Sequence, residues 1–417
     1  MKNKVVVELI TIGDELLIGQ VVNTNASWLG NELQKNGFFL KHVETIGDDE
    51  SEILDAFENA SKRAHIVLIT GGLGPTDDDL TKAALCRYFN TKTTLNQEAL
   101  EVIRTLFEKR GMELTPRNYE QAMLPELCNY IPNAVGTAPG MWFEGNDVIY
   151  VSMPGVPFEM QNMVTNEILP RLKQRFETIH YAKRTVLVTG IGESFLADKI
   201  QSWEKSLPNF LSLAYLPQYG IVRLRLSGWH ADMDFLNETI EKEINTLMPH
   251  IMPYFFGTEE DKLEEIVLKL LKERKQTLAT AESCTGGNIA HLITGIAGSS
   301  TVFNGSVVAY ANSAKENLLG VDAKLIEKHG AVSQEVVESM ARNACRVLKT
   351  DFAVATSGIA GPDGGTLEKP VGTVWIAVAT PKETFSQRYN FGNTRENTIK
   401  RASITALNML RKWLLEN

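Results

Sequence analysis

The sequence predicts an α/β protein with three parts: a mainly parallel, doubly wound sheet, a small α+β module and a second α/β domain. In the first and last thirds, short continuous apolar runs alternate with helical patterns. Unbroken apolar runs such as residues 5–10 and 66–69 are typical of strands that are covered on both faces. We place the three domains at residues 1–170, 171–253 and 254–417.

Composition limits the possible classes of protein. The chain has 417 residues and a net charge of -9, which counts against a general nucleic-acid binder. The four cysteines are far apart, as expected of reduced thiols in the cytoplasm, and the seven histidines show no zinc-binding pattern. No apolar run is long enough for a signal peptide or a membrane span. The modular layout favours a homodimer.

The first third reads as alternating strands and helices. Asp14 and Asp48 each follow a predicted strand, so a parallel sheet brings both to its carboxyl edge, where such sheets bind ligands. We expect strands at 5–10, 38–46 and 66–69, a loop at 11–15, and helices at 23–35 and 52–64.

The loop at residues 70–81 carries the strongest local signal of the first half. Gly71, Gly72 and Gly74 allow a backbone cradle for phosphate. The three carboxylates of 77–79 favour a divalent cation of the Mg, Mn or Co type, and we expect its ligands to be Asp14, Asp48 and Asp79. The alternative is that Asp78 or Asp79 is an acidic cap of the next helix.

The middle of the chain changes character near residue 170. Gly190-Ile191-Gly192-Glu193 follows a short strand and opens a helix. We interpret this module as a spacer or dimerisation element and residues 253–260 as a linker. The elements expected here are helices at 95–109, 118–123, 193–203 and 232–248, and strands at 148–152, 186–189, 211–215 and 221–227.

The last third has a turn of small residues, 281–287, between a strand and a helix. Ser283 lies where a nucleophile would use the backbone N–H groups of Thr285, Gly286 and Gly287. Two alternatives stay open: the turn is only a helix cap, or Cys284 is the nucleophile through a thiol activated by the helix N-terminus. The remaining elements expected are strands at 276–280, 301–310, 352–356, 370–379 and 387–391, and helices at 263–272, 289–293, 314–319, 334–348 and 396–415.

Other candidate residues of the last third also follow predicted strands, so we expect them at the same edge of the sheet as Ser283. Lys315 lies in the first turn of a helix that we expect Asn312 or Ser313 to cap, where a second positive charge is disfavoured. If enclosed, Lys315 is able to take the proton of Ser283, which is Ser-Lys catalysis without a metal. The remaining candidates are Tyr310 as a proton relay, Ser357 and Gly358 in a glycine-rich loop, and Arg395 or Arg401 for a substrate phosphate.

The first half resembles a known family. Thr70-Gly71-Gly72-Leu73-Gly74-Pro75, with Asp14, Asp48 and Asp79, is similar to the molybdopterin-binding domain of the MogA and MoaB type. With Gly13-Asp14-Glu15-Leu16-Leu17 and the 153–160 segment, it resembles the N-terminal domain of the CinA family, which has a KH-like domain after it. The resemblance implies metal-dependent hydrolysis of ADP-ribose to AMP and ribose 5-phosphate.

The last third resembles the PncC-type nicotinamide mononucleotide deamidase of the same family. Its motifs are 281–287, Tyr310 with Asn312 and Lys315, 329–333, and 357–365 with 369–374. The resemblance implies that Ser283 attacks the carboxamide, that Lys315 is its base, and that Tyr310, Ser357 and Arg395 are substrate-site residues. No cofactor is expected for this reaction.

The leading hypothesis is therefore a bifunctional pyridine-nucleotide recycling hydrolase that acts on nicotinamide mononucleotide and ADP-ribose. One alternative is a deamidase whose N-terminal domain only binds a nucleotide. The other is a non-enzymatic competence factor that acts through protein or DNA contacts.

Overall fold

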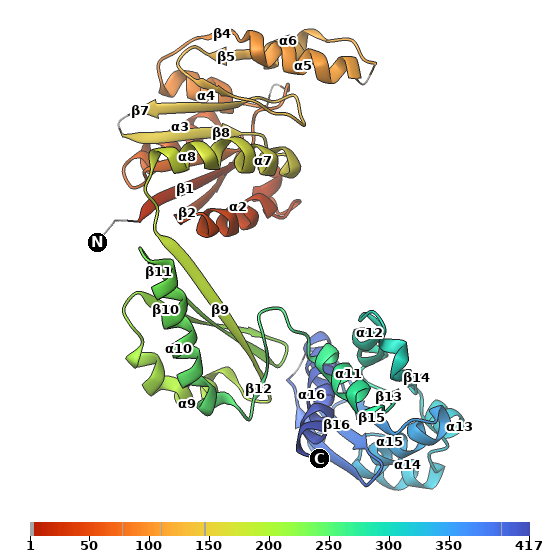
Figure 1. Cartoon of the computed structure of the whole chain (residues 1–417). Coiled ribbons are helices and arrows are strands. Elements are labelled where there is room, and N and C mark those ends of the chain that lie inside the picture. The colour runs from red at the N-terminus through yellow and green to blue at the C-terminus, as the bar shows by residue number, and fades with distance from the viewer. Residues whose placement is uncertain (1–3, 77, 110, 146, 393) are drawn as a thin grey trace. The chain divides into compact units, whose positions relative to one another are not determined.

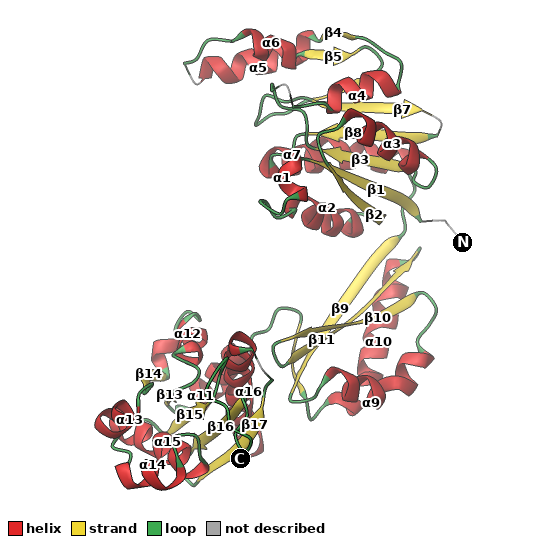
Figure 2. Ribbon diagram, turned by 180° about the vertical axis from the view of Figure 1, so that it is seen from behind, coloured by secondary structure: helices red, strands yellow, loops and turns green. Residues whose placement is uncertain are grey.

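The protein is described here from a computed structural model that covers residues 4–417 except 77, 110, 146 and 393. Two compact units are present: residues 1–182 with 228–237, and residues 183–227 with 238–417. Figures 1 and 2 show helices together with strands in every part of the chain, so the predicted α/β class is confirmed. None of the described helices combines the length and the apolar character needed to cross a bilayer.

The first unit is built on a six-stranded sheet in the order β2-β1-β3-β8-β7-β6. Strands β2, β1, β3 and β8 are parallel, whereas β7 and β6 are antiparallel. The strands are β1 (Val5–Ile12), β2 (Phe38–Ile46), β3 (Ile66–Thr70), β6 (Asn129–Ile131), β7 (Gly140–Gly145) and β8 (Val148–Met153), with a separate pair of β4 (Thr93–Leu95) and β5 (Met123–Pro125).

Helices cover both faces of this sheet, as a doubly wound fold requires. Leu29, Met160 and Leu172 belong to the apolar core of one face, and Ile53, Leu85 and Leu100 to that of the other. The helices are α1 (Asp14–Leu17), α2 (Thr24–Lys35), α3 (Glu50–Ser61), α4 (Thr81–Tyr88), α5 (Gln97–Lys109), α6 (Pro116–Gln121), α7 (Pro157–Met163) and α8 (Leu169–Arg175), with a π-helical turn at Val164–Ile168.

Two details of the first unit differ from expectation. Of residues 11–15, expected as a loop, the first two belong to β1 and the last two to the short helix α1. Helix α4 begins at Thr81 with Leu80 as its N-cap, so neither Asp78 nor Asp79 starts or caps it. The acidic-cap alternative is therefore wrong.

The middle of the chain forms a four-stranded sheet in the order β10-β11-β9-β12. Residues 253–260, expected as a linker, contain β12 (Phe255–Thr258), which pairs antiparallel with β9. The linker prediction is wrong because the apolar pair Phe255-Phe256 completes a sheet edge. The other elements are β9 (His180–Thr189), α9 (Glu193–Ser206), β10 (Leu211–Gln218), β11 (Ile221–His230) and α10 (Met233–Ile251).

The C-terminal part contains a five-stranded sheet in the order β14-β13-β15-β16-β17. Strands β14, β13 and β15 are parallel, so their carboxyl ends share one edge, and β16 and β17 are antiparallel. The strands are β13 (Leu278–Glu282), β14 (Phe303–Val308), β15 (Phe352–Gly358), β16 (Thr373–Ala379) and β17 (Thr384–Asn390).

Helices again form a layer on each face. Helices α11, α12 and α16 pack in one core, which includes Leu271, Ile289 and Leu410, and α14 and α15 supply Ile326 and Val337 to the opposite core. Helix α14 was not expected, although Asp322 caps its start and Gly330 follows its end. The helices are α11 (Leu263–Arg274), α12 (Asn288–Thr294), α13 (Asn312–Leu319), α14 (Ala323–His329), α15 (Gln334–Leu348) and α16 (Arg395–Glu416), with a 3-10 turn at Ser299–Thr301.

Candidate active site

Ser283 lies in the turn that joins β13 to α12. Its backbone N–H donates to the carbonyl of Thr356 at 3.0 Å, and its carbonyl accepts from the N–H of Gly286 at 3.1 Å. The turn depends on Gly286 and Gly287, which have φ values of 63° and 95°. A Cβ on Gly286 would meet no atom within 4 Å, so this side of the turn is open to a ligand.

The buried carboxylate of Glu282 stabilises the turn through hydrogen bonds. The side chain is 0% exposed. It accepts the hydroxyl of Thr285 at 2.7 Å and the N–H groups of Gly287, Ile289 and Ala290 at 3.1, 3.0 and 2.8 Å. The Glu282 side chain, rather than that of Ser283, therefore accepts the first N–H groups of α12 and caps this helix.

Replacing Glu282 by glutamine is expected to destabilise the protein. The amide NH2 of glutamine would face backbone N–H groups, which leaves buried donors without an acceptor. Hydrogen bonds to a charged group contribute about 1.5–3 kcal/mol each, so we expect a loss of about 3 kcal/mol in the free energy of unfolding. Urea and thermal unfolding of wild type and Glu282→Gln measure it. An unchanged midpoint would mean that Glu282 does not hold the turn.

Lys315 is enclosed rather than solvated. Its side chain is 1% exposed, although α13 carries it only four positions into the helix. Burial lowers the pKa of Lys315. Its Nζ donates to the carbonyls of Ala309 at 2.9 Å and Tyr310 at 3.2 Å. The N-cap of α13 is Ala311, so the expected cap by Asn312 or Ser313 is wrong.

The sheet register places Ser283 and Lys315 at the same edge. Glu282 and Val308 are partners on the parallel strands β13 and β14, and the N–H of Ala309 donates to the carbonyl of Glu282 at 2.8 Å. The carbonyl of Ala309 then holds the Lys315 amine. Through these two hydrogen bonds, Ala309 connects β13, which precedes Ser283, to Lys315 on α13.

Cys284 is poorly suited to be the nucleophile. Burial raises the pKa of its thiol to about 12, against a weaker opposite effect of the Lys315 charge. The expected lowering of this pKa by the helix N-terminus is therefore wrong, because the loss of solvent dominates. At neutral pH Cys284 is an inert thiol in the core.

Backbone donors for an oxyanion differ in part from those expected. The N–H of Gly286 donates to Ser283 and that of Gly287 to Glu282, so both are already used. In the part of the chain that the structure describes, the N–H groups of Cys284 and Thr285 donate to no other residue. These two are the free donors of the turn.

Tyr310 and Arg395 meet at the start of α16. The Arg395 guanidinium donates to the Tyr310 hydroxyl at 2.8 Å and to the carbonyl of Gly361 at 3.0 Å. Tyr310 is 60% exposed, so its hydroxyl faces solvent and the arginine. This arrangement favours ligand contact over proton relay, and the relay role stays a prediction.

The other substrate-site candidates, Ser357, Gly358 and Arg401, have different environments. The Ser357 hydroxyl donates to the carbonyl of Ala331 at 2.7 Å and fastens a neighbouring loop. Gly358 faces Val374 across the antiparallel pair, and a Cβ there would lie 2.7 Å from the carbonyl oxygen of Thr373. Arg401 lies in a separate pocket, described below, so Arg395 is the better placed arginine.

In the first unit, Asp14 and Asp48 form a pair at the carboxyl edge. Each backbone N–H donates to the other carboxylate, at 3.1 and 3.2 Å. Burial raises the pKa of Asp48, and the charges of Asp14, Glu15 and Asp78 add to this effect. Negative charge is therefore crowded at this edge, as expected.

Asp79 has a different environment. Its carboxylate accepts the N–H of Gly74 at 2.7 Å and that of Thr76 at 2.9 Å, so it braces the glycine loop from inside. A Cβ on Gly71, Gly72 or Gly74 would collide with atoms of Ile12, Thr81 or Asp79. Loop closure alone thus requires these glycines, and their phosphate contact stays a prediction.

The expected metal ligands are only partly brought together. Among the described residues, no group of three His, Cys, Asp or Glu side chains is arranged to hold a metal ion. Asp14 and Asp48 fit as two oxygen ligands for a hard cation. Asp79 as the third stays a prediction, and Asp77 lies outside the described residues.

Family models match most of the chain, and a relative matches its full length. The model of the CinA C-terminal domain matches residues 260–414, that of the damage-inducible protein CinA KH domain matches 183–257, and that of the probable molybdopterin binding domain matches 8–174. A CinA-like protein of Cytophaga hutchinsonii is 44% identical over 416 residues, which cover 100% of both chains. The chain belongs to the CinA family.

Other CinA relatives match either the full length of this chain or a part of it. A putative competence-damage inducible protein of Clostridium beijerinckii is 38% identical over 98% of this chain and 99% of its own. A crystal structure of a competence/damage inducible protein from Agrobacterium tumefaciens is 38% identical and covers 37% of this chain and 93% of its own, with a TM-score of 0.36. These names describe competence and damage induction rather than a reaction.

Proposed function

We propose that the C-terminal domain hydrolyses the carboxamide of nicotinamide mononucleotide to nicotinic acid mononucleotide and ammonia. The observation that carries this is the Lys315 amine, which is buried and has a lowered pKa. A neutral amine has two N–H groups and one lone pair. The carbonyls of Ala309 and Tyr310 accept both N–H groups, which leaves the lone pair for the hydroxyl proton of Ser283.

The reaction proceeds through an ester of Ser283. The hydroxyl oxygen attacks the carboxamide carbon while Lys315 takes the proton. The N–H groups of Cys284 and Thr285 stabilise the negative oxygen of the tetrahedral intermediate. Lys315 gives this proton to the amide nitrogen, which leaves as ammonia. Lys315 then takes a proton from a water molecule, whose oxygen attacks the ester carbon, and passes that proton to the Ser283 oxygen as nicotinic acid mononucleotide leaves.

The substrate phosphate is assigned to Arg395. Its guanidinium is exposed and is positioned by Gly361 and Tyr310, so its free edge suits a bidentate contact with phosphate. Arg401 is excluded because it faces another pocket.

Ammonia release from nicotinamide mononucleotide tests this function. Turnover should be equal with and without a chelator, since the proposed steps use only side chains and water. Nicotinamide riboside, which lacks the phosphate, should be a poorer substrate. Absence of turnover would reject this substrate assignment and reopen the class of amide.

We propose a second activity for the first unit, hydrolysis of ADP-ribose to AMP and ribose 5-phosphate. The crowding of Asp14 and Asp48 supports it, since paired carboxylates at a sheet edge suit a divalent cation. Such an ion, when bound, would neutralise the charge of the pyrophosphate. Asp14 and Asp48 would hold it, and the loop at 70–76 would contact the substrate.

Asp48→Asn is expected to lower ADP-ribose turnover by about 100-fold or more, because one ligand charge is lost. AMP formation with added Mg²⁺ or Mn²⁺ measures it, and ammonia release from nicotinamide mononucleotide should not change. Equal AMP formation by variant and wild type would reject the metal role. Binding of ADP-ribose without turnover in wild type would leave a nucleotide-binding domain.

A further inference from the structure

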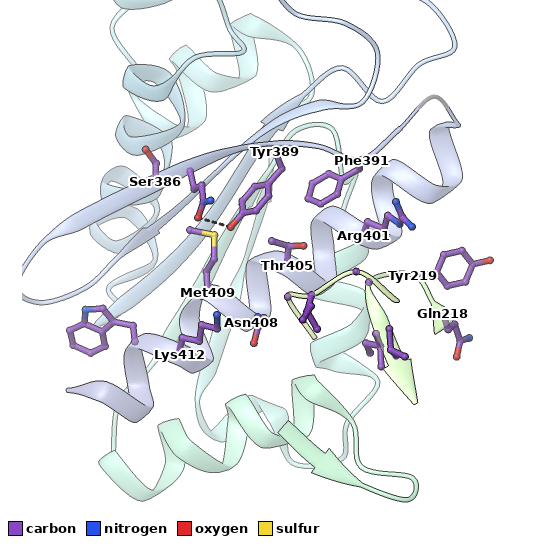
Figure 3. A pocket seen from close by; sticks show the side chains of 18 of the residues that line it. Gln218, Tyr219, Ser386, Tyr389, Phe391, Arg401, Thr405, Asn408, Met409 and Lys412 are labelled. Carbon is purple, nitrogen blue, oxygen red and sulfur yellow. Dashed lines mark hydrogen bonds between the residues drawn. The ribbon is translucent and has the colours of Figure 1, made fainter. Parts of the chain in front are cut away.

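A pocket of about 1200 Å³ lies within the second unit, apart from the candidate active site. One wall is formed by the loop before α9 and the turn between β10 and β11, and the other by β17 and α16. Figure 3 shows the labelled side chains of α16 and β17 that line it. Ser283, Lys315 and Arg395 are not among the lining residues.

One corner of the pocket gathers hydrogen-bond donors at Gly190. A Cβ on Gly190 would lie 3.2 Å from the amide nitrogen of Asn408 and 3.8 Å from the amine of Lys412. With a φ of 82°, Gly190 keeps this space free of a side chain. Two donors of α16 and the backbone of the Gly190 loop thus meet at one point.

Asn408 has a donor that none of the described residues accepts. The residue is 5% exposed, and its Oδ1 accepts from the Nε of Arg411 at 3.0 Å. Its amide NH2 lines the pocket and has no acceptor among the described residues. The amide NH2 therefore opens onto the pocket, where it is available to an acceptor atom of a ligand.

The start of α9 supplies positive potential at the same corner. This helix has 14 residues, and its N-cap, Gly192, offers no side chain to its first N–H groups. Gly190 and Gly192 both line the pocket. Uncapped N–H groups beside a lysine amine and a free amide favour an anion with several oxygens, such as a phosphate.

An aromatic surface lies on the β17 side of the pocket. The rings of Tyr389 and Phe391 are stacked, with centroids 5.3 Å apart and an angle of 14° between their planes. Trp413 is also part of the lining. Flat aromatic faces of this kind bind planar bases by stacking.

Acidic side chains offset part of the positive charge of the pocket. Glu193, Glu383 and Glu416 also line the pocket, so its charge is mixed. Glu383 is within hydrogen-bond reach of the Trp413 indole N–H at 3.4 Å. A ligand with one anionic end and one neutral planar end fits this distribution better than a polyanion does.

We propose that this pocket binds a nucleoside monophosphate, with its phosphate at Gly190, Asn408 and Lys412 and its base against Tyr389 and Phe391. The Gly190-Ile191-Gly192-Glu193 segment thereby gains a role as part of a small-molecule site. The site is separate from both proposed reactions and does not depend on either.

Isothermal titration of the full chain with AMP, adenosine and ribose 5-phosphate tests the proposal. AMP should bind more tightly than either fragment. Asn408→Asp keeps the oxygen that accepts from Arg411 but places a negative charge at the phosphate, so AMP affinity should fall about tenfold or more. Asn397→Asp is the matched control, since it adds the same charge to the same pocket roughly 16 Å along α16.

Comparing the AMP affinity of wild type and Asn408→Asp distinguishes binding in this pocket from AMP binding elsewhere on the chain. Equal affinity in wild type and Asn408→Asp would place AMP elsewhere and overturn the proposal, as would absence of AMP binding. Ribose 5-phosphate binding as tight as AMP would remove the base from the assignment. If Asn408→Asp does not fold, as judged by its thermal midpoint, Lys412→Met provides the test with the same expected loss.

Discussion

Replacing Ser283 by alanine is expected to lower kcat for ammonia release from nicotinamide mononucleotide by about 10⁴-fold or more. The variant loses the only oxygen that the proposed mechanism uses to form the ester, and losses of this order follow removal of a catalytic nucleophile. The backbone of the turn does not need the hydroxyl, because its bonds to Thr356 and Gly286 use main-chain atoms. Thermal stability should therefore stay near that of wild type.

Cys284→Ala is the matched control for that substitution. The thiol is buried with a raised pKa, so its loss should change kcat by less than about tenfold, through packing alone. A Cys284→Ala variant that loses activity while Ser283→Ala keeps it would reverse the assignment of the nucleophile.

Replacing Lys315 by methionine is expected to lower kcat by about 10³-fold, within the range that general-base catalysis contributes. Methionine has a similar length and fills the same buried site without a charge. Lys315→Arg is the informative partner, because arginine keeps the positive charge but cannot lose its proton. Both variants should be inactive if the lysine acts as a base, whereas activity in Lys315→Arg would show that only the charge matters.

The pH dependence of the wild type follows from the same group. Because burial lowers the pKa of Lys315, the rate should rise with pH as the amine loses its proton, with a midpoint below the ordinary lysine value of about 10.4. The unfolded chain binds more protons here than the folded chain, so stability should also rise with pH up to the unfolded pKa. Lys315→Met should remove this contribution to both slopes, and a wild-type midpoint above the ordinary value would contradict the burial argument.

The sequence was sufficient for much of this fold because continuous apolar runs such as Ile66–Thr70 mark strands covered on both sides. It was not sufficient for β12, where a short apolar pair between Pro253 and Gly257 has the composition of a linker. Only the pairing of β12 with β9 gives it a role. Helix α14 was missed in spite of its caps because seven residues carry little periodicity.

In the candidate site, too, the sequence predicted the residues in local patterns but not those whose role depends on the folded structure. Ser283 and Lys315 were selected as candidates because a turn of small residues and a lysine at a helix start are local patterns. Glu282 was missed, since its function depends on burial and on four donors that the turn brings to it. A run of carboxylates also does not reveal that Asp79 accepts from the N–H groups of Gly74 and Thr76, and its role as a third metal ligand stays a prediction.

The central claim is that Ser283 forms an ester with the substrate, and rapid acid quench of the wild type with nicotinamide mononucleotide tests it most directly. Peptide mass spectrometry with fragmentation distinguishes Ser283 from the adjacent Cys284. The mechanism predicts an acyl adduct on Ser283 that forms and decays with turnover and is absent in Ser283→Ala. An adduct on Cys284, or ammonia release by Ser283→Ala at the wild-type rate, would contradict it.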